Sequence, residues 1–439
     1  MGMFFYKSNN GIRGVRKEID MKATLVIHSI DNLITLDGED RARSGKEQGE
    51  IGLIEGGILA VGNDKIIYVG EGELPEDIKT DSSTEFIDAS RKTVTPGLID
   101  SHTHLVHGGS REHEFKLKLE GVDYLDILAS GGGIHSTVEA TRAASFDELY
   151  DKAEKSLDIM RSFGVTTVEA KSGYGIGDFD TELRQLEVAK KLNEDKELDI
   201  VSTFMGAHAI PEEYEDKPEE FVDVLVNDMM PKVVEKDLAK FNDVFCEKGV
   251  FTIDQSRKIL LEGKKLGLEA KIHADEIVSL GGAELSAEVG AISAEHLMAA
   301  SEEGIEDMAE KGVIAVLLPG TSFNMQKGTI APARDMIKEG VPVALSTDYN
   351  PGSCPTENLQ FIMTLGSLTL KMTPAEVITS VTINAAAALG IEEEKGSLKV
   401  GKVADISIFD VPNLEYMMYH FGINHTSMVI KDGKVIWED

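Results

Sequence analysis

Short apolar runs rich in β-branched residues recur along the middle of the chain, and they constrain the fold more than any other feature of the sequence. The first run ends at His104, and seven more follow at residues 165–170, 200–205, 243–246, 269–273, 291–296, 313–318 and 341–347. Helix-like stretches separate most of them, as at residues 145–163, 181–193, 253–266, 282–289 and 305–310. Continuous apolar strands that alternate with helices are typical of a parallel sheet covered on both faces. Eight such units within about 250 residues predict an α/β fold, a TIM-like (β/α)8 barrel.

An open, doubly wound sheet would show the same alternation of strands and helices. Such a sheet often carries a Gly-rich phosphate-binding loop after its first strand, and no such loop follows the run that ends at His104. The glycines at 131–133 come later and lack the Lys-Ser/Thr pair of a P-loop. The sequence therefore favours the barrel, and we expect residues 131–133 to lie in an active-site loop.

Both ends of the chain show a different pattern, with short β-rich segments punctuated by glycine. Asn63-Asp64 and Asp432-Gly433 each lie between two short apolar runs, which is typical of β-hairpin turns. We expect the two ends to pair into one small β-sandwich domain beside the barrel. The predicted divisions are a loose N-terminal extension at 1–20, the N-terminal part of the β domain at 21–90, the barrel at 91–390 and the C-terminal part of the β domain at 391–439.

The charge of the chain limits the partners that it can have. Asp and Glu number 77 and Lys and Arg 44, which gives a formal net charge of −33. This charge argues against nucleic acid and anionic membrane as partners and leaves a small-molecule substrate. The two cysteines form no Cys-x-x-Cys motif, so we expect no disulfide framework and a cytoplasmic location. No apolar segment approaches the ~18 residues of a membrane span.

Polar residues collect where the predicted barrel strands end, which is where barrel enzymes carry their catalytic groups. His102 and His104 are two residues apart, so both side chains point the same way from the strand, into the barrel. His273 and Asp348 end two other strands and can add a nitrogen and an oxygen. Three nitrogens and one carboxylate suit Zn²⁺ or Fe²⁺ with a coordination position left open. Taken singly, these residues would more often be core histidines or a turn former, and only their combination favours a metal site.

The segments "TPGLIDSHTH", "IHADE", "SAEH" and "STDYNPGS" resemble the amidohydrolase superfamily. Within it, "GSREHEF", "EAKSGYG", "LLPGTSFNM" and "TDYNPGSCPTEN" are similar to the imidazolonepropionase family, and the resemblance covers nearly all of the chain from about Met21. It implies metal-dependent hydrolysis of the cyclic amide 4-imidazolone-5-propanoate to N-formimidoyl-L-glutamate in histidine degradation. It also implies one Zn²⁺ or Fe²⁺/Fe³⁺ ion per chain and a homodimer.

The resemblance assigns roles residue by residue. The positions that match the ligands of a single metal ion are His102, His104, His273 and Asp348. The positions that match substrate contacts are Arg111, Tyr174, His208, Glu276, Asn350, Gly352 and Ser353. His296 matches a histidine beside the metal, and with Asp348 and Glu276 it forms the expected catalytic set. Asp348 would carry the proton of the attacking water, while either His296 or His208 would polarise the carbonyl.

Arg111 would bind the propionate of the substrate through two parallel hydrogen bonds. The alternative is an ion pair with Glu112 or Glu114 on the surface. Lys171 could be a carboxylated lysine between two metals, but it is expected in a turn, and the resemblance is to enzymes with a single metal. His107, His113, His135 and Cys354 are expected to be loop, supporting or packing residues.

Two other functions remain possible from the sequence. A deaminase of a heterocyclic ring would share the four metal ligands and His296 but would not need Arg111 together with Tyr174. A non-catalytic scaffold would keep the barrel and lack one or more ligands, and this sequence contains all four.

Overall fold

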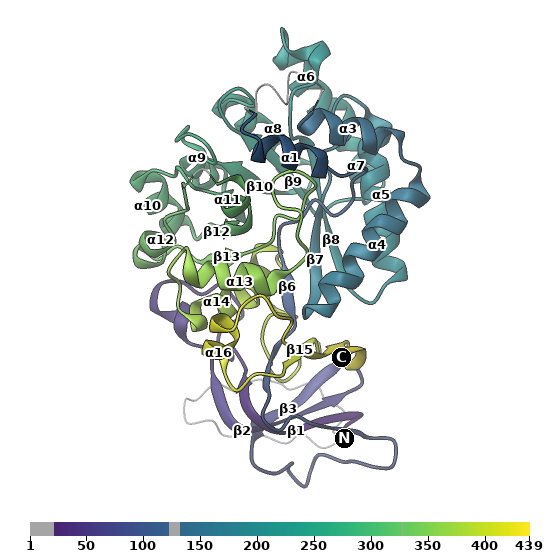
Figure 1. Ribbon diagram of the computed structural model, residues 1–439, viewed down its shortest axis with the longest axis vertical. Helices are drawn as coiled ribbons and strands as arrows, with labels where there is room; N and C mark the ends of the chain where they lie inside the picture. The colour runs from purple at the N-terminus through teal and green to yellow at the C-terminus, as the bar shows by residue number, and fades with distance from the viewer. Residues whose placement is uncertain (1–21, 123–131, 327) are drawn as a thin grey trace.

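Eight parallel strands form the central sheet of the structure, which is a computed structural model that describes residues 22–122, 132–326 and 328–439 (Figure 1). The predicted extension at 1–20 and the glycine at 131 lie outside the described residues. The strands are hydrogen-bonded in chain order: β6 (Leu98–Asp100), β7 (Val165–Lys171), β8 (Asp199–Ala207), β9 (Phe241–Cys246), β10 (Glu269–Ala274), β11 (Ser293–His296), β12 (Ile314–Leu317) and β13 (Val343–Leu345).

The sheet closes on itself where its first and last strands meet. The Asp348 amide donates to the His102 carbonyl (3.0 Å), and the His104 amide donates to the Tyr349 carbonyl (2.8 Å). Just before this point, the Ser101 amide donates to Ser346 Oγ at 2.8 Å. The residues that follow β6 and β13 therefore form a seam. Three of the four predicted metal ligands lie on it, His102 and His104 on one side and Asp348 on the other.

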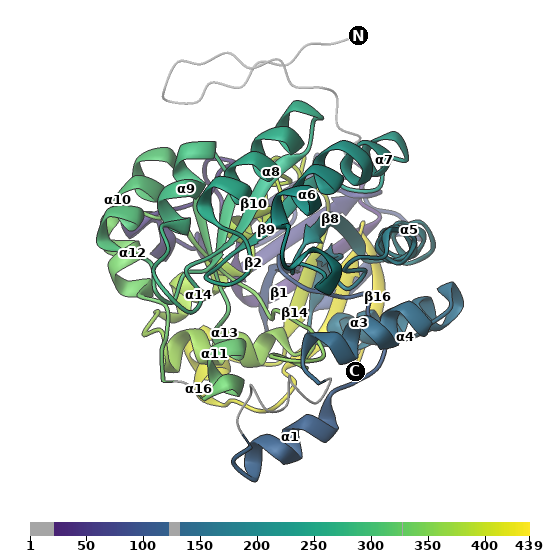
Figure 2. The same cartoon turned by 90° about the horizontal axis from the view of Figure 1, so that it is seen from above.

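Helices surround the sheet, and Figure 2 shows them as a ring around the strands when the molecule is seen from above. The helices of the barrel region are α1 (Glu112–Leu119), α3 (Ile134–Ala143), α4 (Phe146–Ser162), α5 (Phe179–Asp195), α6 (Pro218–Val224), α7 (Met230–Glu235), α8 (Ile253–Lys265), α9 (Gly282–Val289), α10 (Glu302–Lys311), α11 (Pro319–Met325), α12 (Ala333–Glu339), α13 (Leu359–Leu368), α14 (Pro374–Ser380) and α15 (Ile383–Ala388). Capping boxes fix where several begin: Ser145 with Glu148 starts α4, and Thr252 with Gln255 starts α8.

Helix α15 closes the amino-terminal end of the barrel. Ala385, Ala386 and Leu389 pack against Ile99 and Phe241, which lie near the beginnings of their strands. The opposite end, where the strands finish, therefore remains as the place at which polar side chains can meet a substrate.

The second sheet contains strands from both ends of the chain. Its order is β16-β15-β14-β5-β1-β2-β3, with β4 paired to β1. The bounds are β1 (Leu25–Ile34), β2 (Leu53–Gly62), β3 (Lys65–Glu71), β4 (Glu85–Asp88), β5 (Thr93–Pro96), β14 (Ile406–Phe409), β15 (Thr426–Lys431) and β16 (Lys434–Glu438), and helix α16 (Leu414–Tyr419) lies between β14 and β15. The hairpin turns predicted at Asn63-Asp64 and Asp432-Gly433 are confirmed, since the flanking residues pair antiparallel.

The predicted fold class is confirmed: a parallel barrel stands beside a small β domain built from both chain ends (Figure 1). Lys431 of β15 joins the two, because its ammonium lies 3.1 Å from Asp199, at the start of β8, and 3.4 Å from Asp405. None of the described helices is long and apolar enough to cross a membrane.

Candidate metal centre and active site

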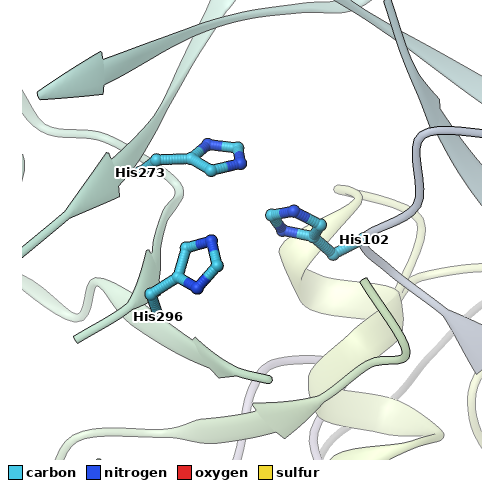
Figure 3. Close-up of side chains that lie close together, drawn as sticks. All are labelled: His102, His273 and His296. Carbon is cyan, nitrogen blue, oxygen red and sulfur yellow. The ribbon is translucent and has the colours of Figure 1, made fainter. Parts of the chain in front are cut away.

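Histidines from three barrel strands and one aspartate from a fourth meet at the open end of the barrel. Figure 3 shows the rings of His102, His273 and His296 turned towards one another. The ligand atoms of these three lie within 4.8 Å of one another, and so do those of His102, His104 and Asp348. The two groups share His102 and together contain all four predicted ligands, and the first also contains His296, which was predicted beside the metal and not as a ligand. The ring centroids of His102 and His273 are 4.7 Å apart, which brings the fourth predicted ligand to the same point.

The Nδ1 atoms of the three predicted ligand histidines all have partners. His102 Nδ1 lies 2.8 Å from Glu295 Oε2, and His273 Nδ1 lies 3.1 Å from Asp243 Oδ1. His104 Nδ1 lies 3.3 Å from the carbonyl of Ser172. A partner of this kind holds the proton on Nδ1 and leaves a lone pair on Nε2.

The opposite nitrogens fit a metal ion. Nε2 of His102 and Nε2 of His273 are buried and have no hydrogen-bond partner in the described part of the chain. A buried polar atom without a partner is costly, and the cost disappears if the lone pair binds a cation. With Asp348 Oδ1 only 3.5 Å from His102 Nε2 and 3.8 Å from His104 Nε2, the donor set matches the nitrogen and carboxylate ligands of Zn²⁺ or iron.

Burial keeps most of these imidazoles neutral. It lowers the pKa of His102 and of His104 well below the usual value, and that of His296 to about 3. Burial alone would also lower the pKa of His273, but the adjacent Asp243 carboxylate outweighs it and the pKa is raised. Neutral imidazole is the form that binds a metal, so the environment suits that role for His102 and His104.

Asp348 is held in an unusual backbone conformation by its surroundings. Its φ is +54°, a region that non-glycine residues rarely occupy and that costs about 1–3 kcal/mol. Thr321 Oγ1 donates a hydrogen bond to Asp348 Oδ2, so that Oδ1 is the oxygen that faces the histidines. Burial raises the pKa of the Asp348 carboxyl, partly offset by His296. Thr321, in "LLPGTSFNM", was missed as a site residue, and no spacing in the sequence connects it to Asp348.

Arg111 precedes helix α1 and is mostly buried. Its Nε donates to Glu114 Oε2 at 3.1 Å, and the side chain is 11% exposed. The ion pair considered as an alternative is therefore present with Glu114, but it lies inside the protein and not on its surface. The guanidinium packs against Gly352, where any side chain would collide with it. Because Gly352 follows Asp348 by four residues, Arg111 lies beside the loop that leaves the metal centre.

Tyr174 and His208 form one wall next to His104. The rings of His104 and His208 are stacked with centroids 5.0 Å apart, and Tyr174 lies 5.6 Å from the first and 5.5 Å from the second. Burial raises the pKa of Tyr174, and the charges of Asp348 and Arg111 act on it in opposite directions. The Tyr174 ring therefore lies beside one predicted metal ligand, His104, and beside His208.

The loop after β13 is shaped by its own side chains. Asn350 Oδ1 accepts hydrogen bonds from the amides of Gly352 (2.8 Å) and Ser353 (2.7 Å), and Asn350 Nδ2 donates to the Asp348 carbonyl at 2.6 Å. On the other side of the centre, Glu276 Oε2 lies 3.7 Å from His296 Nε2. All of the predicted substrate positions are thus near the metal centre or in loops that contact it.

Five charged residues lie beneath the histidines, and the sequence interpretation considered only Lys171 among them. These are Glu169, Lys171, Asp243, Lys271 and Glu295, all fully buried. Lys171 was expected in a turn; it is the last residue of β7, and its Nζ lies 3.0 Å from Glu169 and 2.8 Å from Asp243. The signal that could have revealed them is a charged residue at alternate positions of an otherwise apolar strand.

The residues kept outside the site have structural contacts. His107 Nδ1 lies 2.8 Å from the carbonyl of His104 and supports that segment. Cys354 is buried, and burial raises the pKa of its thiol well above the usual value, which does not suit a nucleophile.

Comparisons with known proteins agree with the motifs in the sequence. The sequence profile of the Amidohydrolase family matches residues 93–436. An imidazolonepropionase of Alkaliphilus metalliredigens is 58% identical over 416 residues, which cover 95% of this chain and 98% of that protein. One from Alkaliphilus oremlandii is 56% identical, with 95% and 99% covered.

Solved structures show the same fold at low sequence identity. The structure of 5-methylcytosine deaminase from Klebsiella pneumoniae has a TM-score of 0.71 and 16% identity, and it covers 94% of this chain and 98% of its own. That likeness is one of fold alone, whereas the family profile and the close relatives bear out the resemblance carried by the motifs. The chain belongs to the amidohydrolase family and, within it, to the imidazolonepropionases.

Proposed function

We propose that the protein hydrolyses the ring amide of 4-imidazolone-5-propanoate to N-formimidoyl-L-glutamate, a step of histidine degradation. The observation that carries the proposal is the identity of 51–58% to curated imidazolonepropionases over 94–95% of the chain. The buried cluster of His102, His104, His273 and Asp348 supports it, because hydrolysis of an amide at neutral pH needs an activated water. When bound, a Zn²⁺ or iron ion at this cluster would supply Lewis acidity to the carbonyl and to the water.

Residues that surround the histidine cluster would bind the substrate. Arg111 has a guanidinium that can bind the propionate in a chain of net charge −33. Its Nε donates to Glu114, and its two terminal nitrogens lie against Gly352 in the loop after β13. Tyr174 is near enough to bind the same carboxylate or the ring. Asn350, Gly352 and Ser353 would contact substrate or product through a loop already held by the Asn350 amide.

Proton movement is assigned to Asp348 and Glu276. Asp348 takes a proton from the attacking water and passes it to the ring nitrogen as the carbon–nitrogen bond breaks, because its carboxylate lies beside the reacting centre. Glu276 orients the water or holds a ring N–H, since its carboxylate is close to His296.

His296 is the better candidate for polarising the carbonyl. His208 Nδ1 lies 3.0 Å from the carbonyl of Gly173 and so carries its proton there. Burial lowers the pKa of His208 to about 4, so at neutral pH its Nε2 bears a lone pair and accepts a hydrogen bond. In the described part of the chain no backbone carbonyl lies against the His296 ring, and this neutral ring can donate to the developing oxyanion.

Further properties are proposed on the strength of family membership. They are one Zn²⁺ or Fe²⁺/Fe³⁺ ion per chain, a homodimer, a cytoplasmic location and division of the chain at 21–90, 91–390 and 391–439. Elemental analysis tests the metal content, analytical ultracentrifugation the homodimer and limited proteolysis the division of the chain. A ratio well above one metal per chain would contradict the single-ion site.

The activity itself is tested by following the loss of imidazolone propionate absorbance with purified protein. We expect turnover with release of N-formimidoyl-L-glutamate and without ammonia. A metal-loaded protein that leaves this substrate untouched but releases ammonia from a heterocycle is instead a deaminase. Inertness towards both, with metal bound, identifies a scaffold.

Replacing Arg111 by methionine should raise KM by at least about 100-fold with a small change in kcat, because two charge-assisted hydrogen bonds to the substrate carboxylate are worth about 3 kcal/mol together at the lower end of their usual range. Steady-state kinetics measure the effect. Arg142→Met is the matched control, since that side chain is 49% exposed and pairs with Asp178. An equal loss with an imidazolone that lacks the carboxylate would show that Arg111 acts on something else.

Replacing Thr321 by valine should lower kcat about 10-fold and leave KM nearly unchanged. The variant removes the hydrogen bond that fixes Asp348 Oδ2, and a bond to a charged group is worth about 1.5–3 kcal/mol. Thr321→Ser should restore the rate. Thr379→Val is the control, because its buried hydroxyl bonds only to the Ala375 carbonyl of its own helix.

A further inference from the structure

A line of alternating charges crosses the interior of the barrel beneath the histidines. In order it contains Glu295, Lys271, Glu169, Lys171 and Asp243, from strands β11, β10, β7, β7 and β9. Lys271 Nζ lies 3.6 Å from Glu295 Oε1 and 3.2 Å from Glu169 Oε1. Lys171 Nζ lies 3.0 Å from the same Glu169 oxygen and 2.8 Å from Asp243 Oδ2. All five side chains are fully buried.

Each end of this line touches a histidine of the metal centre. Glu295 uses Oε2 for His102 Nδ1, while its Oε1 faces Lys271 and accepts a hydrogen bond from Ser293. Asp243 uses Oδ1 for His273 Nδ1, while its Oδ2 accepts from Lys171. Each terminal carboxylate therefore divides its two oxygens between a lysine and a histidine.

Packing does not account for these charges. The layer beneath them is apolar, with Ile99, Phe241 and helix α15, and Lys271 Nζ stands 5.2 Å from the centre of the Phe241 ring. Barrel interiors are usually filled by branched apolar side chains. Buried ion pairs often contribute no more stability than apolar residues of the same size. The five charged residues are thus more simply explained by the two histidines, His102 and His273, that the ends of the line contact.

We infer that Lys171 and Lys271 are positioning residues for the metal centre. By holding Asp243 and Glu295, they fix the Nδ1–H form of His273 and His102 and aim both Nε2 atoms at one point between opposite strands. Glu169 links the two lysines, so the two histidines are held by one continuous network. The inference rests on the metal site proposed above.

The test measures metal binding, not turnover. Lys171→Met keeps the length of the side chain and removes its charge. Lys431→Met is the matched control: this lysine side chain is 2% exposed and bound to carboxylates, but it lies near the start of β8, at the other end of the barrel. Zn²⁺ affinity is measured by competition with a chromophoric chelator, and the visible spectrum of the Co²⁺-loaded proteins reports the ligand geometry.

Both variants should lose thermal stability, but only Lys171→Met should bind Zn²⁺ about 10- to 100-fold more weakly, the usual effect of losing support for a metal ligand, and change the Co²⁺ spectrum. In an Asp243→Asn background, Lys171→Met should cause little further loss if it acts through that carboxylate. Wild-type affinity and spectrum in Lys171→Met would overturn the inference.

Two further outcomes are separable. If the wild-type chain itself binds no metal, the proposed metal site fails and not the network alone. If Lys171→Met does not fold, Lys271→Met replaces it, since that ammonium lies 3.6 Å from Glu295 at the other end of the line. It should weaken Zn²⁺ binding a few-fold, and unchanged binding there would count against the inference.

Discussion

Replacing Asp348 by asparagine is expected to lower kcat about 10⁴-fold. The variant removes both the proton carrier and the carboxylate of the predicted ligand set, whose Oδ1 lies 3.5 Å from His102 Nε2. Asparagine tolerates the positive φ of this position, and its amide oxygen can still accept from Thr321. The fold should therefore be retained.

Single-turnover kinetics with quantified metal content separate the two losses. A variant that still binds the metal but turns over at the reduced rate identifies the missing proton carrier. Asp410→Asn serves as the control, since that side chain is 77% exposed in the β domain. Activity within a factor of ten of the wild type in Asp348→Asn would remove Asp348 from the mechanism.

Removing the metal with a chelator should abolish activity and lower the thermal midpoint of unfolding. The second effect follows because binding to the folded state alone stabilises it by about 2.7 kcal/mol at a ligand concentration of 100 times the Kd. The unpartnered Nε2 atoms of His102 and His273 would again carry the cost of burial. Activity assays and calorimetry before and after dialysis measure both effects.

Re-addition completes this experiment. Stoichiometric Zn²⁺ or Fe²⁺ should restore activity and midpoint together, whereas Mg²⁺ should restore neither, because it prefers oxygen ligands. Full activity in a protein shown by elemental analysis to be metal-free would contradict the proposed chemistry.

Much of the fold could be predicted because strands buried on both faces read as continuous apolar runs. The runs at 165–170 and 269–273 correspond to Val165–Lys171 and Glu269–Ala274. Helix α1 was not predicted, since it is short and carries Glu112, Lys116 and other polar residues without an apolar stripe. Its place depends on Arg111 and the loops that it meets, which periodicity does not encode.

Site residues that lie on one strand could be predicted from their spacing in the sequence. Contacts between residues on different strands could not, because they depend on how the strands are aligned. His102 and His104 share a face of one segment, so alternation predicts their convergence. The contact of Lys171 with Asp243 depends on the register of β7 relative to β9, which are separated by β8 in the sheet. Local sequence carries no information on that register.

The seam between β6 and β13 has a consequence for synthesis of the chain. Asp100 and Thr347, which hydrogen-bond across it, are 247 residues apart. While the chain is being made, the His-x-His segment emerges long before Asp348, which supplies the carboxylate of the predicted ligand set. Parallel pairing over such separations is slow. A complete ligand set therefore requires the last strand, β13, to pair with the first, β6.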